Sequence, residues 1–398
     1  MIFRTFFAFI AVFLATTKAC ANMAFNTEYY DSVEISLLTC QPHDEVYSLY
    51  GHTAIRYHDK HSNGYDITLN YGVFDWKKPY FVARFILGLT DYELGAFPYP
   101  LFLMEYRHFG SMVTEQVLNL SSYEKSMLHR ALSENLLPAN RVYRYNYFYN
   151  NCTTKARDII EQCVNGRVEY AEDKYVACTY RDIVHDMTRN NPWTRFGNDL
   201  LLGIKADQTI GRREHEFLPA NLMYDFDRAN INAGDSIRPL VSERRIAVPS
   251  GVQMVGQSFP VTPWQMAIFL AVMAIGIYSF EIKRRKAFRL WDITLMITVG
   301  TIGIVLFLML FSQHPTVSAN LQFILLNPLP WLFLWPVIKG RQTRYWNITA
   351  ILAVLFLAGA LLQHYAEGIH VLALCLLLQW HIHHMTSTKR VLQAKKQK

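Results

Sequence analysis

The sequence predicts an α+β domain followed by an all-α bundle of five transmembrane helices. Three observations favour this fold class: a short apolar N-terminal run, a middle segment that mixes strand and helix patterns, and five long apolar stretches in the last third. We therefore expect three parts, which are a signal peptide at residues 1–21, a globular domain at 22–262 and a membrane domain with a tail at 263–398.

The N-terminus has the pattern of a secretory signal. Arg4 precedes an apolar run from Thr5 to Ala15, and Ala19-Cys20-Ala21 fits a small-residue cleavage site. The run is shorter than a bilayer-spanning helix needs. We expect cleavage after Ala21, with an uncleaved anchor as the alternative.

The five apolar stretches each have about the length of a spanning helix. Basic residues cluster in alternate connectors, 281–289 and 339–344, and in the C-terminal tail, whereas 312–320 and 363–369 hold no Lys or Arg. The positive-inside rule then makes the tail cytoplasmic and puts residues 22–262 on the outer side. The stretches are Pro263–Phe280, Ile293–Phe311, Leu321–Ile338, Tyr345–Leu362 and Ala366–Ile382.

The predicted topology accounts for the net charge of +7. After residue 262 there are 13 Lys and Arg against 3 Asp and Glu, so this part carries +10 and the part before it carries −3. The positive charge therefore belongs to the cytoplasmic face of a membrane domain, and we expect no nucleic-acid partner.

The globular domain shows strand patterns before helix patterns. Gly88–Gly110 is aromatic and contains two prolines, so it is expected to be irregular. The expected strands are Tyr30–Leu38, Tyr47–His58, Asp66–Phe74, Val113–Asn119 and Arg141–Tyr149, and the expected helices are Ser122–Leu136, Cys152–Cys163 and Thr179–Met187.

Cys152 is the first candidate catalytic residue. It follows Asn150 and Asn151, either of which is a good N-cap, so the thiol is expected at a helix N-terminus. A helix N-terminus and a nearby imidazole both lower a thiol pKa. A buried structural cysteine or half of a disulfide is the alternative, and Cys163–Cys178 is the favoured disulfide because its loop is short.

His52 is the candidate base for this thiol. It lies in an apolar strand directly after Gly51, which indicates close backbone approach at that point. If the following hairpin is centred near His61, residue 52 lies opposite residue 70, so Asn70 is the expected orienting partner and Asp75 is the next choice. Both His52 and Asn70 are also compatible with ordinary hydrogen-bonded positions in a sheet.

Other catalytic classes fit the sequence less well. No CxxC, HExxH or GxSxG motif is present, so we expect neither a metal site nor a serine hydrolase, and no cofactor is expected. Polar residues next to the predicted spans, His314, Asn320 and Asn327, together with Asn151, are candidates for contact with lipid or substrate. Helix capping and a proline kink are equally good explanations for the membrane residues.

At these residues the chain resembles the lipoprotein N-acyltransferase Lnb family of bacterial envelopes. The likeness covers nearly the whole chain after the signal peptide, and its combination of motifs is specific although each motif alone is weak. The matching stretches include Gly51-His52-Thr53-Ala54, Asn70-Tyr71-Gly72-Val73-Phe74-Asp75, Asn151-Cys152, Phe217-Leu218-Pro219 and His314-Pro315-Thr316.

The resemblance implies a circularly permuted papain-like domain, akin to NlpC-type peptidases and lecithin–retinol acyltransferases, in which the histidine strand precedes the cysteine helix. It implies Cys152 as nucleophile and His52 as base, in an enzyme of the bacterial inner membrane whose catalytic domain is periplasmic. The implied partners are a phospholipid acyl donor, a diacylated lipoprotein acceptor and the membrane.

Two alternatives stay open at this point. A membrane-anchored cysteine peptidase or amidase of the cell envelope would use the same pair of residues but would not need five spans. A non-enzymatic membrane protein that binds a partner would need neither Cys152 nor His52.

Overall fold

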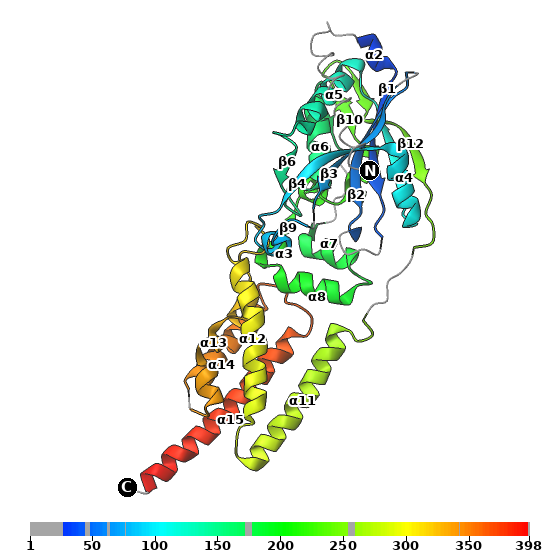
Figure 1. Ribbon diagram of the computed structural model, residues 1–398. Helices are drawn as coiled ribbons and strands as arrows, with labels where there is room; N and C mark the ends of the chain where they lie inside the picture. Colours follow the sequence, from blue (N-terminus) through cyan, green and yellow to red (C-terminus); the bar gives the residue numbers. More distant parts are fainter. Residues whose placement is uncertain are drawn as a thin grey trace. The chain divides into compact units, whose positions relative to one another are not determined.

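The computed structural model describes residues 27–43, 48–61, 64–75, 77–171, 177–253, 259–341 and 343–396, so the predicted signal peptide lies outside the described residues (Figure 1). The chain forms two compact units. The N-terminal unit comprises Met1–Ala177 and Ile210–Gly256, and the C-terminal unit comprises Cys178–Thr209 and Gln257–Lys398.

A seven-stranded antiparallel sheet forms the centre of the N-terminal unit. Its strand order is β12-β5-β1-β2-β3-β4-β6. The chain order β1, β2, β3, β4 is kept across the middle of the sheet, because these strands are joined by local connections. The strands are β1 (Val33–Cys40), β2 (His52–Asp59), β3 (Asp66–Val73), β4 (Asp91–Pro98), β5 (Val113–Leu118), β6 (Val142–Arg144) and β12 (Val241–Val248).

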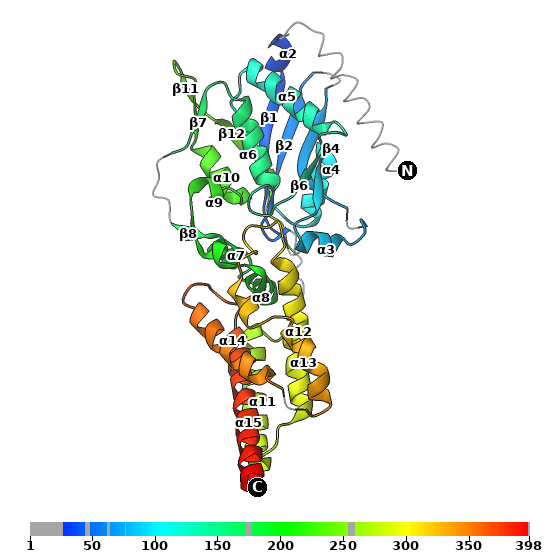
Figure 2. The same ribbon diagram turned by 90° about the vertical axis from the view of Figure 1, so that its left-hand side faces the viewer.

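Helices cover both faces of this sheet, because its side chains alternate between two apolar cores. Ile35 and Leu37 of β1 pack in the larger core with α5 and α6, whereas Leu38 and Cys40 pack with α4 on the opposite face (Figure 2). The unit's helices are α2 (Thr27–Asp31), α3 (Phe81–Ile86), α4 (Tyr99–His108), α5 (Ser122–Leu136), α6 (Cys152–Cys163), α9 (Arg212–His215) and α10 (Pro219–Asp227).

A small three-stranded sheet in the order β11-β10-β7 completes the N-terminal unit. Its strands are β7 (Arg167–Glu169), β10 (Asn230–Asn232) and β11 (Ile237–Pro239). A two-stranded pair of β8 (Cys178–Thr179) and β9 (Thr209–Ile210) lies where the chain passes between the two units.

The sequence prediction was wrong in Gly88–Gly110. This segment is not irregular, since it forms strand β4 followed directly by helix α4. Pro98 is the N-cap of α4 and Pro100 lies in its first turn, where proline needs no intrahelical hydrogen bond. The two prolines therefore mark the strand-to-helix junction. The predicted strand at Arg141–Tyr149 is also too long, because the strand that pairs with β4 covers only Val142–Arg144.

The C-terminal unit is helical. Three of its helical segments, Pro263–Arg284, Arg289–Met309 and Leu321–Ile338, are long and apolar enough to cross a membrane, and Tyr345–Gly359 is a shorter apolar helix. All five predicted apolar stretches contain helix. The elements are α11 (Pro263–Arg284), α12 (Arg289–Met309), η3 (Leu321–Ile324), α13 (Leu329–Ile338), α14 (Tyr345–Gly359) and α15 (Ile369–Lys396).

The segment Cys178–Thr209 packs with these apolar helices and belongs to the C-terminal unit, although it precedes the first of them by many residues. It contains α7 (Tyr180–Met187), α8 (Pro192–Leu201) and η2 (Ile204–Asp207). Phe196, Leu200 and Leu201 pack against the apolar core of the helices. The compact units therefore do not divide at a single point after residue 262, and the expected domain boundaries stay a prediction.

Side-chain amides hold this segment in place. Asn320 donates to the carbonyl of Leu200 over 2.8 Å, and Gln322 donates to the carbonyl of Asp199 over 2.8 Å. Gln363 donates to the carbonyl of Leu202 over 3.1 Å. These bonds satisfy carbonyls at the end of α8 that have no partner within the helix.

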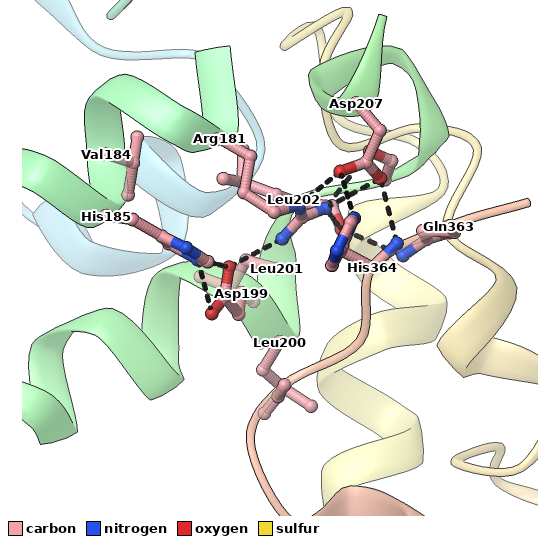
Figure 3. A network of polar contacts seen from close by, with 12 residues as sticks. Arg181, Val184, His185, Asp199, Leu200, Leu201, Leu202, Asp207, Gln363 and His364 are labelled. Carbon is pink, nitrogen blue, oxygen red and sulfur yellow. Dashed lines mark hydrogen bonds and ion pairs between the residues drawn. The ribbon is translucent and has the colours of Figure 1, made fainter. Parts of the chain in front are cut away.

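A buried ionic network links the same elements (Figure 3). Arg181 is 2 % exposed and lies between two carboxylates, with Nη1 2.7 Å from Asp199 and Nε 2.6 Å from Asp207. His185 lies 2.9 Å from Asp199. Asp207 also accepts from the backbone amide of His364 over 3.2 Å, so the network reaches the loop before α15.

Candidate active site

Cys152 is the first residue of helix α6, as the sequence predicts. Asn151, rather than Asn150, is the N-cap, and its Oδ1 accepts from the amides of Thr153 and Thr154 over 2.9 Å each. The Thr154 hydroxyl accepts from the Asn151 amide over 2.9 Å and completes a capping box. The cap places the half-buried thiol at the positive end of the helix dipole.

Asn151 also fixes the position of this helix start within the unit. Its Nδ2 donates to the carbonyl of Phe217 over 2.9 Å and to that of Tyr147 over 3.0 Å. Asn151 is 6 % exposed, and its bonds to Phe217, Thr153 and Thr154 are buried. Asn151 thus anchors the catalytic candidate to two separate loops.

His52 is the first residue of β2, and its Nε2 lies 3.2 Å from Oδ1 of Asn70 on β3. The observed register pairs Ile55 with Leu69, two residues away from the predicted register, in which 52 lies opposite 70. A shift of two residues leaves side chains on the same face of a sheet, so His52 and Asn70 still meet. Asn70 accepts only through its carbonyl oxygen, which assigns the Nε2 proton to His52 and leaves Nδ1 as the basic nitrogen.

The thiol and the imidazole shift each other's pKa. Burial alone would raise the pKa of the Cys152 thiol, but the charge of His52 and hydrogen bonds from His52, the Thr53 backbone and the Thr153 hydroxyl lower it to about 7. Burial lowers the pKa of His52, but the interactions with Cys152 and the bond to Asn70 outweigh this and raise it. The pair therefore favours a thiolate and an imidazolium near neutral pH.

A buried contact joins strand β2, which carries His52, to helix α6, which carries Cys152. The hydroxyls of Thr53 and Thr153 lie 3.1 Å apart, and the two residues are 1 % and 0 % exposed. Each threonine follows one of the two candidates in the chain. This buried contact fixes the start of β2 against the start of α6.

Two glycines give the site its close packing. Gly51 has a φ of +77°, and a Cβ atom there would lie 2.5 Å from the carbonyl oxygen of Cys40, so the close approach expected at Gly51 is present. Gly72 has a φ of +98° and lies in a bulge of β3 between Asn70 and Val73. A Cβ at Gly72 would lie 3.7 Å from Cβ of Cys152. The bulge thus turns this part of β3 toward the thiol.

The remaining candidates do not join this group. Asp75 is exposed in the turn after β3, where its Oδ1 accepts from the amide of Lys77 over 2.9 Å. Asn320 accepts from Gln322 and Gln363 and caps η3. Asn327 bonds to the Ile324 carbonyl and the Leu329 amide within a single turn. These contacts favour structural roles.

His314 is 8 % exposed in the loop after α12, within the C-terminal unit. Its backbone amide donates to the Ser312 hydroxyl over 3.3 Å. A role of His314, Asn320, Asn327 or Asn151 in binding lipid or substrate stays a prediction.

The favoured disulfide is wrong. Cys163 is a free, buried thiol at the end of α6, so no bond joins it to Cys178. Burial raises the pKa of Cys163 to about 11. We therefore expect the two thiols at opposite ends of α6 to differ in reactivity, because Cys152 and not Cys163 has an imidazole and a helix N-terminus beside it.

Sequence reasoning missed the tyrosines around the thiol. Tyr92 of β4 is paired with Tyr143 of β6, and both phenols interact electrostatically with Cys152. Burial raises the pKa of Tyr143 well above its usual value, so this phenol stays protonated. Tyrosine is frequent between residues 141 and 149, and no sequence signal distinguishes Tyr143 there.

Comparison with known families gives two matches. A family model described as the Lnb N-terminal periplasmic domain matches residues 21–186, which contain His52, Asn70 and Cys152. A second, described as the Lnb transmembrane domain, matches residues 255–391, which contain α11 to α14 and most of α15. No curated protein and no solved structure matches the chain.

Proposed function

Since this chain belongs to the Lnb family, with a periplasmic domain and a transmembrane domain, we propose that it is a lipoprotein N-acyltransferase. The enzyme moves an acyl chain from a phospholipid to the α-amino group of a diacylglyceryl-cysteine lipoprotein through a thioester on Cys152. The observation that carries the proposal is the Cys152 thiol, whose pKa is lowered to about 7 beside His52.

The first step forms the acyl-enzyme. His52 holds the thiol proton, and the thiolate of Cys152 attacks the carbonyl carbon of a phospholipid ester. The tetrahedral intermediate collapses when the ester C–O bond breaks, and the imidazolium gives its proton to the departing alkoxide of the lysophospholipid. The product is a thioester on Cys152.

The second step transfers the acyl chain. The α-amine of the lipoprotein attacks the thioester carbonyl, and His52 takes the proton that the amine loses. The C–S bond then breaks, the thiolate is regenerated and an amide is formed. Asn70 orients the imidazole in both steps, as the 3.2 Å bond to Nε2 supports.

The C-terminal unit holds the lipid substrates at the membrane. Large apolar side chains are exposed along its helices, as expected for surfaces that face lipid, and they include Phe269, Val272, Ile275, Leu332 and Val354. We propose that all five helical segments span the bacterial inner membrane, with the N-terminal unit in the periplasm and the C-terminal tail in the cytoplasm. The alternating basic connectors support this orientation.

The fold of the N-terminal unit is proposed to be a permuted papain-like arrangement. Its support is the order of the elements, in which the strand that begins with His52 precedes the helix that begins with Cys152. The third member of such a site is Asn70.

Mass spectrometry of lipoprotein N-termini tests the function. Cells that rely on this protein for N-acylation should accumulate diacylated lipoproteins when it is depleted, and wild-type protein should restore the triacylated form. Persisting triacylated lipoproteins, in cells without any other N-acyltransferase, would overturn the proposal. Cleavage of cell-wall peptides by the purified chain, without acyl transfer, would favour the cysteine peptidase instead.

The covalent step has its own test. Incubation of the purified full chain with palmitoyl phospholipid should add one palmitoyl group to the peptide that contains Cys152. His52→Ala should remove this adduct, and Asp75→Asn should keep it, because Asp75 is exposed and does not contact His52.

A further inference from the structure

Tyr80, the N-cap of helix α3, combines two features that do not help the fold. Its ring is 84 % exposed, and its backbone is left-handed, with a φ of +57°. A left-handed backbone strains a residue that has a Cβ atom, and an exposed aromatic ring gains no stability from burial. Backbone strain is concentrated at functional positions, so Tyr80 calls for a role beyond folding.

The surface around Tyr80 is basic and aromatic. Lys77 and Lys78 precede it in the turn before α3, and both are exposed. Phe85 on α3 is a second exposed aromatic residue, at 37 %. We call Lys77, Lys78, Tyr80 and Phe85 the α3 surface. Lysines beside aromatic rings are typical of protein surfaces that meet a bilayer, where amines attract anionic headgroups and rings enter the interface.

The α3 surface lies in a connection at the end of the sheet that carries the candidate active site. Helix α3 is part of the segment that leads from the end of β3 to the start of β4. Neighbouring strands are antiparallel, so the start of β2 with His52, the end of β3 and the start of β4 lie at one end of the sheet. The end of β6, from which the chain continues to Cys152, pairs with the start of β4 at the same end.

Stacked aromatic rings connect α3 to the thiol. Phe85 stacks on Phe81 with the ring centroids 6.4 Å apart, and Phe81 stacks on Phe74 at 5.6 Å. Phe74 stacks on Tyr92 at 4.9 Å, and Tyr92 stacks on Tyr145 at 4.0 Å. The two tyrosines at the inner end both interact electrostatically with the active-site thiol. The stack therefore runs from an exposed ring to the thiol.

We propose that the α3 surface docks on an anionic lipid bilayer and that the phospholipid ester reaches Cys152 along this ring stack. The inference rests on the proposed acyl transfer and deepens it, because it names where the lipid donor approaches the thiol. An acyl chain is apolar, so stacked rings offer it a route out of the bilayer that limits contact with water. The bilayer is always within reach, since the same chain carries apolar helices long enough to span it.

Acylation of Cys152 in the full chain, reconstituted in vesicles, tests the charge of the surface. Dipalmitoyl phosphatidylethanolamine is the donor, and the rest of each vesicle is diether phosphatidylglycerol or diether phosphatidylcholine, which have no ester to give. The double variant Lys77→Gln with Lys78→Gln should gain palmitoyl on the Cys152 peptide about 10-fold more slowly than wild type in the anionic vesicles, because it loses the attraction of two amines to the surface. In the neutral vesicles the two proteins should differ little.

Tyr80→Asn tests the ring. Asparagine tolerates the left-handed backbone better than tyrosine, so this variant should unfold at or above the wild-type temperature. Its rate of palmitoylation from vesicles, divided by its rate with p-nitrophenyl butyrate in detergent, should fall several-fold, because this short ester reaches the thiol without a bilayer. Nitrophenolate release gives the second rate.

Leu101→Asn is the matched control. Leu101 is also a large apolar side chain, 58 % exposed, but it lies on α4 just after the end of β4, at the opposite end of the sheet. Its ratio of the two rates should equal that of wild type.

Two outcomes separate the inference from the proposed function. A wild-type ratio in Tyr80→Asn, or an equal effect of the lysine variant in anionic and neutral vesicles, would overturn docking on anionic lipid and leave the acyltransferase proposal standing. Such a result is expected if the α3 surface binds a protein partner instead. Wild-type protein that takes no palmitoyl from either vesicle, although p-nitrophenyl butyrate acylates Cys152, would overturn both.

Discussion

Thr53 and Thr153 touch through their hydroxyls at 3.1 Å, one residue after His52 and one residue after Cys152. The contact is buried and joins a strand and a helix that are a hundred residues apart in the chain. It therefore fixes the elements that carry the candidate base and the candidate nucleophile against each other, and it offers a test of how rigidly the pair must be held.

Replacing Thr153 by Val should destabilise the N-terminal unit by roughly 1–3 kcal/mol, because it leaves the Thr53 hydroxyl buried and unpaired. The double variant Thr53→Val with Thr153→Val should recover most of this loss, since valine has nearly the shape of threonine. A double-mutant cycle of thermal unfolding measures the coupling. Additive losses in the double variant would contradict the paired role.

The reactivity of Cys152 should depend on pH with a midpoint of about 7. The thiolate is the reactive form, so iodoacetamide alkylation rises as pH passes upward through this value. His52→Ala removes the charge and the bond that lower the pKa, so burial dominates and the midpoint moves to higher pH. Peptide-resolved mass spectrometry gives the midpoint, with Cys163 as the unreactive internal control. An unchanged pH midpoint in His52→Ala would show that His52 does not lower the pKa of Cys152.

Asn70→Ala should lower the rate of Cys152 acylation by about 10-fold or more, because the imidazole loses the partner that fixes its tautomer. The pKa of His52 should fall as well, since the bond to Asn70 helps to raise it. Asp75→Ala is the control and should acylate at the wild-type rate. Acylation of Cys152 by p-nitrophenyl butyrate, followed as nitrophenolate release, measures the rate for each variant. Equal rates for Asn70→Ala and Asp75→Ala would show that Asn70 is dispensable.

Gly51→Ala should be more harmful than Gly234→Ala, although both glycines have a positive φ, +77° and +94°. Each substitution costs about 1–2 kcal/mol for the left-handed backbone. Only at Gly51 does the new Cβ meet a neighbour, the Cys40 carbonyl at 2.5 Å, so the backbone before His52 must move. The unfolding temperature and the rate of Cys152 acylation should both be lower in Gly51→Ala than in Gly234→Ala. Equal values for the two variants would mean that the clash at Gly51 is relieved without cost.

Asp199→Asn should destabilise the C-terminal unit by about 3 kcal/mol, because it leaves Asp207 as the one carboxylate that pairs with the buried Arg181 among the described residues. Asp186→Asn is the control, since its pair with Arg189 is 65 % and 74 % exposed at the two side chains. Such a surface pair contributes about 0–1 kcal/mol. Thermal unfolding of the full chain in detergent measures both, and a small effect of Asp199→Asn would show that Asp207 suffices.

The sequence predicted the elements that carry the site because their signals are local. The alternation of Asp66–Val73, the turn before it and the cap at Asn151 each lie within a few residues. The hairpin register was two residues off, but the face was right, because a strand has a period of two. For this reason the predicted contact of His52 with Asn70 is present in the structure.

Features that depend on contacts between distant segments could not be predicted in the same way. Gly72 and Tyr143 meet only after β3, β4 and β6 have paired, and nothing local marks the bulge or the buried phenol. In the sequence alone, Pro98 and Pro100 indicate an irregular segment. In the structure they lie at the junction of strand β4 and helix α4, where proline is tolerated. The association of Cys178–Thr209 with the apolar helices rests on the side-chain amides of Asn320 and Gln363. In the sequence, Asn320 is a candidate for lipid or substrate contact with helix capping as an equally good explanation, and Gln363 has no local signal.

The insertion of Cys178–Thr209 into the C-terminal unit changes how the chain would respond to cutting. The polypeptide passes between the units at 177/178, at 209/210 and at 256/257, so three peptide connections join them instead of one linker. A cut at 177/178 leaves Met1–Ala177 held by strand β12, which pairs with β5. A cut at 256/257 leaves the apolar helices held by α7 and α8. No single nick separates the thiol from its membrane anchor, and a fragment ended at residue 262 would carry two helices without the core on which they fold.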